Sequence, residues 1–228
     1  MSASQSGGVR GSVKALALAV ALSFPPGPAV AQAAGNPNLN AQLLIAAREG
    51  DAARVDRVLA QGAAPDARNR VGKTSLWISS ERGRLDLVER LLAAGADPNL
   101  AALDGVTPLM AASYSGHAVV VQRLLAAGAR ADPVDRMQKP AIVYAAGQGH
   151  AEVLEVLLRA GVGVDTPYEH RLTPLMWAAG QGKPDAVRAL LAHGARTDLR
   201  DDRGLTAADI ARQAGQDGVL ALLRDGAR

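Results

Sequence analysis

Cysteine is absent from the 228 residues of this chain. Its absence excludes a disulfide framework, a thiolate metal site, a thiol nucleophile and lipid attachment at cysteine. Aromatic residues are also scarce, at 3%, although 48% of the chain is hydrophobic. The apolar content is therefore mostly alanine, leucine and valine, of which alanine and leucine are strong helix formers. This composition favours helices that pack closely through small side chains.

An excess of charge of one sign is lacking as well. The chain has 25 Lys and Arg against 22 Asp and Glu, a formal net charge of +3, and Arg10 and Lys14 supply two of those positive charges. A nucleic-acid-binding domain usually carries a concentrated basic face. Nothing in the remaining sequence forms one, so no nucleic-acid partner is predicted.

A long hydrophobic run is missing too, because the largely apolar stretch 15–24 has only ten residues. A helix that spans a ~30 Å hydrocarbon core needs about 20. The stretch follows a basic segment with Arg10 and Lys14, and the small residues 29–31 come after it. These are the parts of a secretory signal peptide. We predict a signal peptide over 1–31, with Ala33 or Ala34 as alternative cleavage sites, and a linker over 32–38; a disordered tail is the alternative. No twin-arginine pair occurs, which favours export of an unfolded chain.

Glycine is abundant, and its spacing reveals a repeat. Two series of glycines share one constant period of about 33 residues, and a fixed period of this length is the signature of a repeat architecture. The first series is Gly50, Gly83, Gly116, Gly149, Gly182 and Gly215, and the second is Gly62, Gly95, Gly128, Gly161 and Gly194. Apolar residues at helical spacing lie before each glycine of both series, as in 85–92 and 153–158. Each period is expected to hold two antiparallel helices of about ten residues, each ending at a glycine, followed by a polar turn such as 69–73 or 201–205.

The third and fifth periods contain the clearest motif. Thr107-Pro108-Leu109 and Thr173-Pro174-Leu175 should open the first helix, with Thr capping free N–H groups and Pro at the first helical position. With Ala-Ala, the Gly-His of 116–117 and the later Leu-Leu and Gly-Ala pairs, this pattern resembles the ankyrin repeat. The resemblance covers essentially the whole chain after the leader and implies an all-α fold, an α-solenoid of stacked helix-turn-helix repeats with short protruding turns. The repeat domain is placed at 39–228, with six units at roughly 36–68, 69–101, 102–134, 135–167, 168–200 and 201–228.

Several units depart from the family pattern. The first lacks Thr-Pro and begins at Leu43, as an N-terminal capping repeat would, and the last ends in a polar outer face. The fourth has Pro140-Ala141 where Thr-Pro is expected, so its first helix is predicted to start one residue early. The usual histidine of the motif is replaced by apolar residues, which predicts a more apolar line between repeats: Leu44, Trp77, Met110, Val143 and Met176.

Residues that could carry chemistry are better explained by the repeat. His117 and His150 occupy the same place in successive units, at a spacing of about 8–10 Å that is too wide for a shared zinc ion. Ser79, Ser80, Ser113 and Ser115 have no histidine and acid placed to converge on them. Asp135 and Asp201 fit capping and turn preferences. We therefore predict no metal site, no cofactor and no catalytic residues.

What the repeat leaves free is a surface. In ankyrin proteins the target usually lies along the concave side, formed by the turn tips and the exposed positions of the first helices. An apolar and aromatic centre with a polar rim is typical of protein interfaces. Mapped onto this register, the candidate partner-binding residues are Arg70, Lys73, Leu103, Asp104, Val106, Tyr114, Ser115, Arg136, Met137, Lys139, Gln148, Glu169, His170, Leu172 and Gln181. Tyr144 and Trp177 are expected to pack in the core or between repeats.

The sequence thus predicts a monomeric, non-catalytic scaffold that is exported to the periplasm and binds a protein partner. Its resemblance to exported bacterial ankyrin proteins suggests support or protection of a periplasmic enzyme, including oxidative-stress enzymes. A secreted effector that binds another organism's proteins is the alternative. A hydrolase or metal enzyme is the least favoured one, because the histidines and acids do not converge.

Overall fold

A computed structural model describes residues 36–225 of the chain, and the predicted signal peptide lies outside this part. The described residues form twelve α-helices and one short 3₁₀ helix, with no strand among them. The helices are α1 (Pro37–Glu49), α2 (Ala52–Ala60), α3 (Ser75–Glu81), α4 (Leu85–Ala93), α5 (Pro108–Ser115), α6 (Ala118–Ala126), α7 (Ala141–Gln148), α8 (Ala151–Arg159), η1 (Glu169–Arg171), α9 (Pro174–Gly180), α10 (Pro184–Ala192), α11 (Ala207–Gln213) and α12 (Asp217–Asp225).

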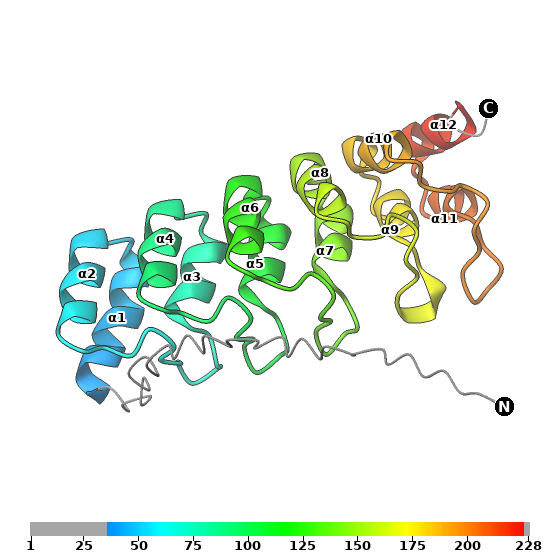
Figure 1. The fold of residues 1–228 in the computed structure, drawn as a ribbon. Coiled ribbons are helices and arrows are strands. Elements are labelled where there is room, and N and C mark those ends of the chain that lie inside the picture. Colours follow the sequence, from blue (N-terminus) through cyan, green and yellow to red (C-terminus); the bar gives the residue numbers. More distant parts are fainter. Residues whose placement is uncertain (1–35, 226–228) are drawn as a thin grey trace, which may run out of the picture. The chain divides into compact units, whose positions relative to one another are not determined.

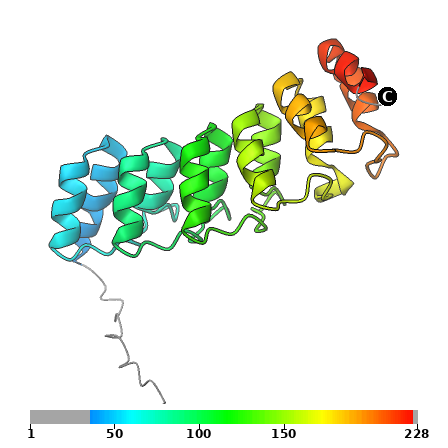
Figure 2. The same ribbon diagram turned by 45° about the horizontal axis from the view of Figure 1, so that its top comes forward.

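The helices form six antiparallel pairs that stack in chain order (Figures 1 and 2). The first helix of each pair packs against its neighbours in one layer, which consists of α1, α3, α5, α7, α9 and α11. The second helices form the other layer, which consists of α2, α4, α6, α8, α10 and α12. The longer connections extend from one side of the stack, at the bottom of Figure 1. This arrangement confirms the predicted α-solenoid of helix-turn-helix repeats.

Threonine caps fix where four first helices begin. Thr74, Thr107, Thr173 and Thr206 precede α3, α5, α9 and α11, and each hydroxyl accepts a hydrogen bond from the backbone N–H three residues later. The bond satisfies one of the N–H groups that a helix start leaves free. The predicted role of Thr107 and Thr173 is confirmed, as is the position of Pro108 and Pro174 in the first turn.

Glycine ends the helices as expected. Every glycine of the two series has a positive φ, from 62° at Gly182 to 95° at Gly62. At Gly116 the φ of 82° is joined by a close approach, because a Cβ there would lie 2.6 Å from the His150 ring of the next repeat. This position needs glycine for both backbone conformation and packing.

Three details differ from the sequence prediction. The helices other than α1 are seven to nine residues long, shorter than the expected ten, because a capping threonine or a glycine lies within two residues of almost every end, as at α3, α4 and α5. Helix α1 begins at Pro37, upstream of Leu43, because the Asn36 side chain accepts a bond from the Asn38 N–H and Pro37 starts the helix. Helix α7 does not start one residue early. It begins at Ala141, which corresponds to Pro108 at the start of α5 in the third repeat. The reason is that Pro140 has the same extended backbone as the capping threonines, although it makes no side-chain cap.

The core lies between the two layers and continues from repeat to repeat. Its largest fully buried members include Leu43, Leu76, Leu109, Leu154 and Leu175. Alanines such as Ala112 and Ala146 are also fully buried, so neighbouring first helices can approach closely. Trp77 is 4% exposed, and its indole Nε1–H donates to the Val106 carbonyl oxygen of the next repeat at 3.0 Å. The apolar replacement of the motif histidine therefore still supplies an inter-repeat hydrogen bond here.

The turns between repeats are held by buried or half-buried polar side chains. Oδ1 of Asp135 accepts the N–H groups of Met137 and Lys139, and Asp201 and Asn69 make the same two bonds in their own turns. This confirms the turn role predicted for the two aspartates. Neighbouring turns are also joined through the backbone, by Leu103 N to Val71 O and by Arg136 N to Asp104 O, both at 3.0 Å.

Candidate functional site

The exposed side of the first helices, together with the adjoining turns, forms one surface, which we call the first-helix face. Each first helix contributes positions at i, i+1 and i+4 to it, as α5 does with the buried Met110 and Ala111 and the exposed Tyr114. Residues with this spacing lie on one side of a helix. The backbone of the face therefore repeats from unit to unit, whereas its side chains differ.

A lysine, a tryptophan and a glutamate meet at the start of this face. Lys73 lies in the turn before α3, and its Nζ lies 3.4 Å from the centroid of the Trp77 ring. The same Nζ is 3.7 Å from Oε1 of Glu81, one turn further along α3. The ammonium is thus attracted by the π-face of the indole and by a carboxylate. Its side chain keeps 29% of its surface exposed.

Two tyrosines continue the cluster into the next repeats. The rings of Tyr114 on α5 and Tyr144 on α7 meet edge to face, with centroids 5.8 Å apart and planes at 84°. The Tyr144 hydroxyl donates to Oδ2 of Asp135, which fixes the ring. Burial is the main cause that raises the pKa of the Tyr144 phenol, followed by its bond to Asp135 and the charges of Asp135 and Asp104. Tyr114 remains 51% exposed.

These residues line a pocket of about 200 Å³, which we call the aromatic pocket. Its walls are Lys73, Trp77, Glu81, Asp104, Val106, Met110, Ala111, Tyr114 and Tyr144. Ligand sites for small molecules usually measure about 300–1,000 Å³. The aromatic pocket is smaller, so it suits a single side chain better than a cofactor.

A related arrangement joins the fourth and fifth repeats. Nζ of Lys139 lies 4.6 Å from the centroid of the Trp177 ring. Trp177 also lines a hollow of about 310 Å³ with Leu172, Gly180, Gln181 and Ile210 among its walls. Gly180 occupies the position of Tyr114 in the repeat and has no side chain to cover this hollow.

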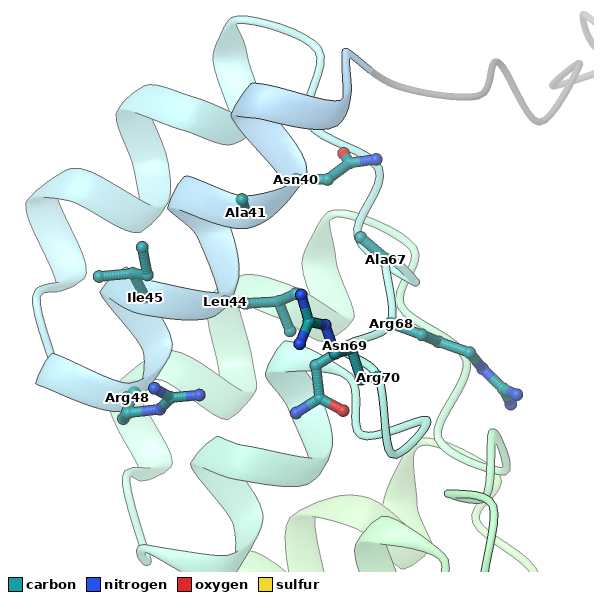
Figure 3. Close-up of a pocket in the computed structure, with 9 residues that line it drawn as sticks. All are labelled: Asn40, Ala41, Leu44, Ile45, Arg48, Ala67, Arg68, Asn69 and Arg70. Atoms are coloured by element: carbon teal, nitrogen blue, oxygen red, sulfur yellow. The ribbon is translucent and has the colours of Figure 1, made fainter.

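A third hollow, of about 470 Å³, lies at the first repeat. Figure 3 shows Leu44 and Arg48 of α1 extending toward the turn that carries Asn69 and Arg70. The Arg68 side chain extends in the opposite direction, away from α1. The Arg68 guanidinium donates to the Ala101 carbonyl oxygen at 2.8 Å, which ties this turn to the next repeat.

The predicted partner-binding residues all lie on turns or first helices, but they differ in exposure. Leu103 and Met137 are 56% and 59% exposed at the turn tips, whereas Val106 and Leu172 are half-buried and pack against the core. Asp104 is exposed, and its Oδ1 accepts the Val106 N–H. Ser115 and Lys139 are half-buried, and the remaining exposed members are Arg70, Arg136, Gln148, Glu169, His170 and Gln181.

The histidines hold repeats together. Nε2 of His117 donates to the Glu81 carbonyl oxygen at 3.0 Å, and Nε2 of His150 donates to that of Tyr114 at 2.9 Å. Each histidine thereby satisfies a carbonyl that the end of the preceding first helix leaves free. Nε2 of His193 lies 2.9 Å from Oε2 of Glu155, and this contact is the first cause that lowers the pKa of Glu155. Within residues 36–225 no three His, Asp or Glu side chains are grouped to hold a metal ion.

Sequence reasoning missed the convergence of Trp77, Tyr114 and Tyr144 around one pocket. Tyr144 was expected to pack between repeats, which it does through Tyr114, yet it also lines the pocket. The sequence signals only one wall of the pocket, because Trp77 and Glu81 lie four residues apart on α3. Such spacing places the members of a helix on one side.

Comparison with known families agrees with this geometry. The family model described as ankyrin repeats (3 copies) matches residues 43–135, 76–168 and 142–228, which together cover most of the chain. The chain belongs to the ankyrin repeat family. A comparison with curated proteins gives no match. Ankyrin repeats are typically non-catalytic and act as scaffolds for protein–protein interaction. None of the ankyrin helices within 36–225 is long and apolar enough to cross a membrane.

Proposed function

We propose that this ankyrin repeat protein is a non-catalytic scaffold that acts in the periplasm and binds one folded protein partner through its first-helix face. The observation that carries the proposal is the exposure of Tyr114, Leu103 and Met137 in the middle of that face. Aromatic residues and methionine are enriched in interface centres. Charged residues, including Arg70 and Glu169, lie toward the ends of the same face.

Preorganisation supports this role. The turns are fixed by Asp135 and Asp201, and successive repeats are tied by His117 and His150. A surface that is already ordered loses little conformational entropy when a partner binds. We expect the scaffold to act as a monomer, since the exposed side chains of the last helix include Asp217 and Arg224.

A crosslinking pull-down from the periplasm tests the binding face. The double substitution Tyr114→Ala/Met137→Ala should reduce partner recovery at least tenfold, because truncation of a hot-spot residue at an interface centre costs about 2 kcal/mol or more. Val119→Ala is the matched control, since Val119 is 60% exposed on α6, outside this face. Equal recovery with the double variant and the control would refute the choice of face.

Cellular location needs a separate experiment. Fractionation into cytoplasm, periplasm and medium should find the protein in the periplasm, and N-terminal sequencing should find its start after Ala31, Ala33 or Ala34. Accumulation in the medium would favour the secreted effector, and an intact Met1–Ala31 segment on the mature protein would refute export.

A further inference from the structure

The aromatic pocket combines ring faces with carboxylates. Trp77, Tyr114 and Tyr144 supply three aromatic side chains, and Glu81 and Asp104 supply two acids at the walls. Asp135 adds a third carboxylate behind Tyr144, to which the phenol donates. The lysine of the turn, Lys73, is the one cation among the residues that line the pocket. The local charge balance is therefore negative.

Lys73 shows which chemistry this arrangement holds. Its ammonium lies over the indole of Trp77 at 3.4 Å and only 3.7 Å from Glu81, longer than a normal charge-assisted hydrogen bond of about 2.7–2.9 Å. The lysine is thus held mainly by the ring and loosely by the acid. A contact of this kind on a partly exposed side chain is weak enough to exchange.

We propose that the aromatic pocket binds an arginine side chain of the partner protein, and that Lys73 is the resident cation which the guanidinium displaces. This inference rests on the proposed function, since it names what the partner places in the first-helix face. A planar guanidinium stacks on aromatic rings and donates several hydrogen bonds to carboxylates, which a compact ammonium does less well. The pocket volume of about 200 Å³ accommodates one such side chain.

The test uses the full repeat protein and small probes, so it does not depend on finding the partner. N-acetyl-arginine methylamide is titrated while the indole N–H signal of Trp77, which donates to Val106, is followed by NMR. The arginine probe should shift this signal saturably. The neutral isostere N-acetyl-citrulline methylamide should bind at least threefold more weakly, because it lacks the charge that the rings and acids attract.

Substitutions in the pocket distinguish binding of an arginine from binding of an acidic group. Glu81→Gln/Asp104→Asn and Tyr114→Ala should each weaken arginine binding by about three- to fivefold. Lys73→Met should strengthen it about threefold, because the competing cation is gone. Glu152→Gln, an exposed acid on α8, is the control and should change nothing.

Two results would overturn the proposal. One is equal binding of the arginine and citrulline probes, or no saturable shift with either. The other is tighter binding of N-acetyl-glutamate methylamide together with its loss in Lys73→Met, which would make Lys73 an anchor for an acidic group. Both leave the pull-down with Tyr114→Ala/Met137→Ala untouched, so the failure of this inference and that of the proposed function are distinguishable.

Discussion

Ser79 on α3 is fully buried, and its hydroxyl is one of four buried serine hydroxyls that have no hydrogen-bond partner in the described part of the chain. The same repeat position holds Ala112, Ala145 and Ala178. An unsatisfied buried hydroxyl costs about 1–3 kcal/mol, and alanine is also the better helix former. The serine therefore contributes little that alanine would not.

We expect Ser79→Ala to raise the free energy of unfolding by about 1 kcal/mol, measured by urea denaturation. Ser115→Ala is the control, because Ser115 lies at the half-buried end of α5 and should change stability by less than about 0.5 kcal/mol. A destabilised Ser79→Ala variant would mean that the hydroxyl has a partner in solution.

At the scale of elements, the turns differ most from one repeat to the next. Gly72, Gly105 and Gly204 have positive φ of 80°, 86° and 79°, but the equivalent residues of the fourth and fifth turns are Gln138 and Arg171, with φ of 55° and 58°. The left-handed conformation costs a residue with a Cβ about 1–2 kcal/mol. These two turns are therefore strained where the others are relaxed.

Gln138→Gly should increase the free energy of unfolding by about 0.5–1 kcal/mol, because the relief of backbone strain exceeds the added entropy of the unfolded chain. Gln148→Gly is the matched control: it lies at the end of helix α7 and should destabilise by up to about 1 kcal/mol. Thermal and urea unfolding of both variants check the prediction, and a lower stability of Gln138→Gly would contradict it.

The stability of helix α11 is expected to depend on pH through Asp209. Asp209 accepts bonds from the Thr206 hydroxyl and N–H and from Arg212, and these contacts lower the pKa of its carboxyl to about 2. Because the folded pKa lies below the unfolded value of 3.8, the stabilisation is present above pH 4 and is lost as the pH falls toward 2.

Asp209→Asn should cost about 1 kcal/mol at pH 7, a value reduced for the partial exposure of the side chain. The difference from the wild type should shrink between pH 4 and pH 2, measured by urea denaturation at several pH values. Asp217→Asn, in the first turn of α12, serves as control and should give a smaller difference at pH 7. A constant difference for Asp209→Asn across this range would exclude a charge effect.

Most of the elements could be predicted from the sequence, because capping threonines, prolines and glycines are local signals that recur at the same positions of successive repeats. The start of α1 at Pro37 was missed, because its signal, Asn36-Pro37, lies upstream of the place that Thr-Pro holds in the other repeats. The aromatic pocket could not be predicted. Trp77, Tyr114 and Tyr144 occupy three different positions of the repeat, and only the stacking of neighbouring helices brings them together.

At the scale of the whole repeat array, stability is approximately a sum of repeat terms and nearest-neighbour terms. Three boundaries carry a bond from the start of the second helix to the preceding repeat: Arg84 to the Gly50 carbonyl, His117 to that of Glu81, and His150 to that of Tyr114. Lys183 occupies this position in the fifth repeat. Among residues 36–225 no bond from the Lys183 side chain to the preceding repeat is found, and no backbone bond joins the turns of the fourth and fifth repeats. The turns of the fifth and sixth repeats are joined, by the Asp202 N–H to the His170 carbonyl oxygen.

Two exposed contacts still cross this boundary, from His193 to Glu155 and from the Arg196 N–H to Asp165. Without the two bonds described above it should open before the others, so that amides of the fifth and sixth repeats exchange faster than those of the third and fourth. Lys183→His should supply the missing bond, to the Gly147 carbonyl, which corresponds to the carbonyls of Glu81 and Tyr114. One hydrogen bond contributes about 1 kcal/mol, so exchange of the last two repeats should slow about fivefold, as measured by hydrogen exchange with mass spectrometry. The reverse change, His150→Lys, should speed exchange across the third and fourth repeats by a similar factor. If Lys183→His left the exchange rates unchanged while His150→Lys raised them, the weakness of this boundary would lie in the strained turns at Gln138 and Arg171 instead.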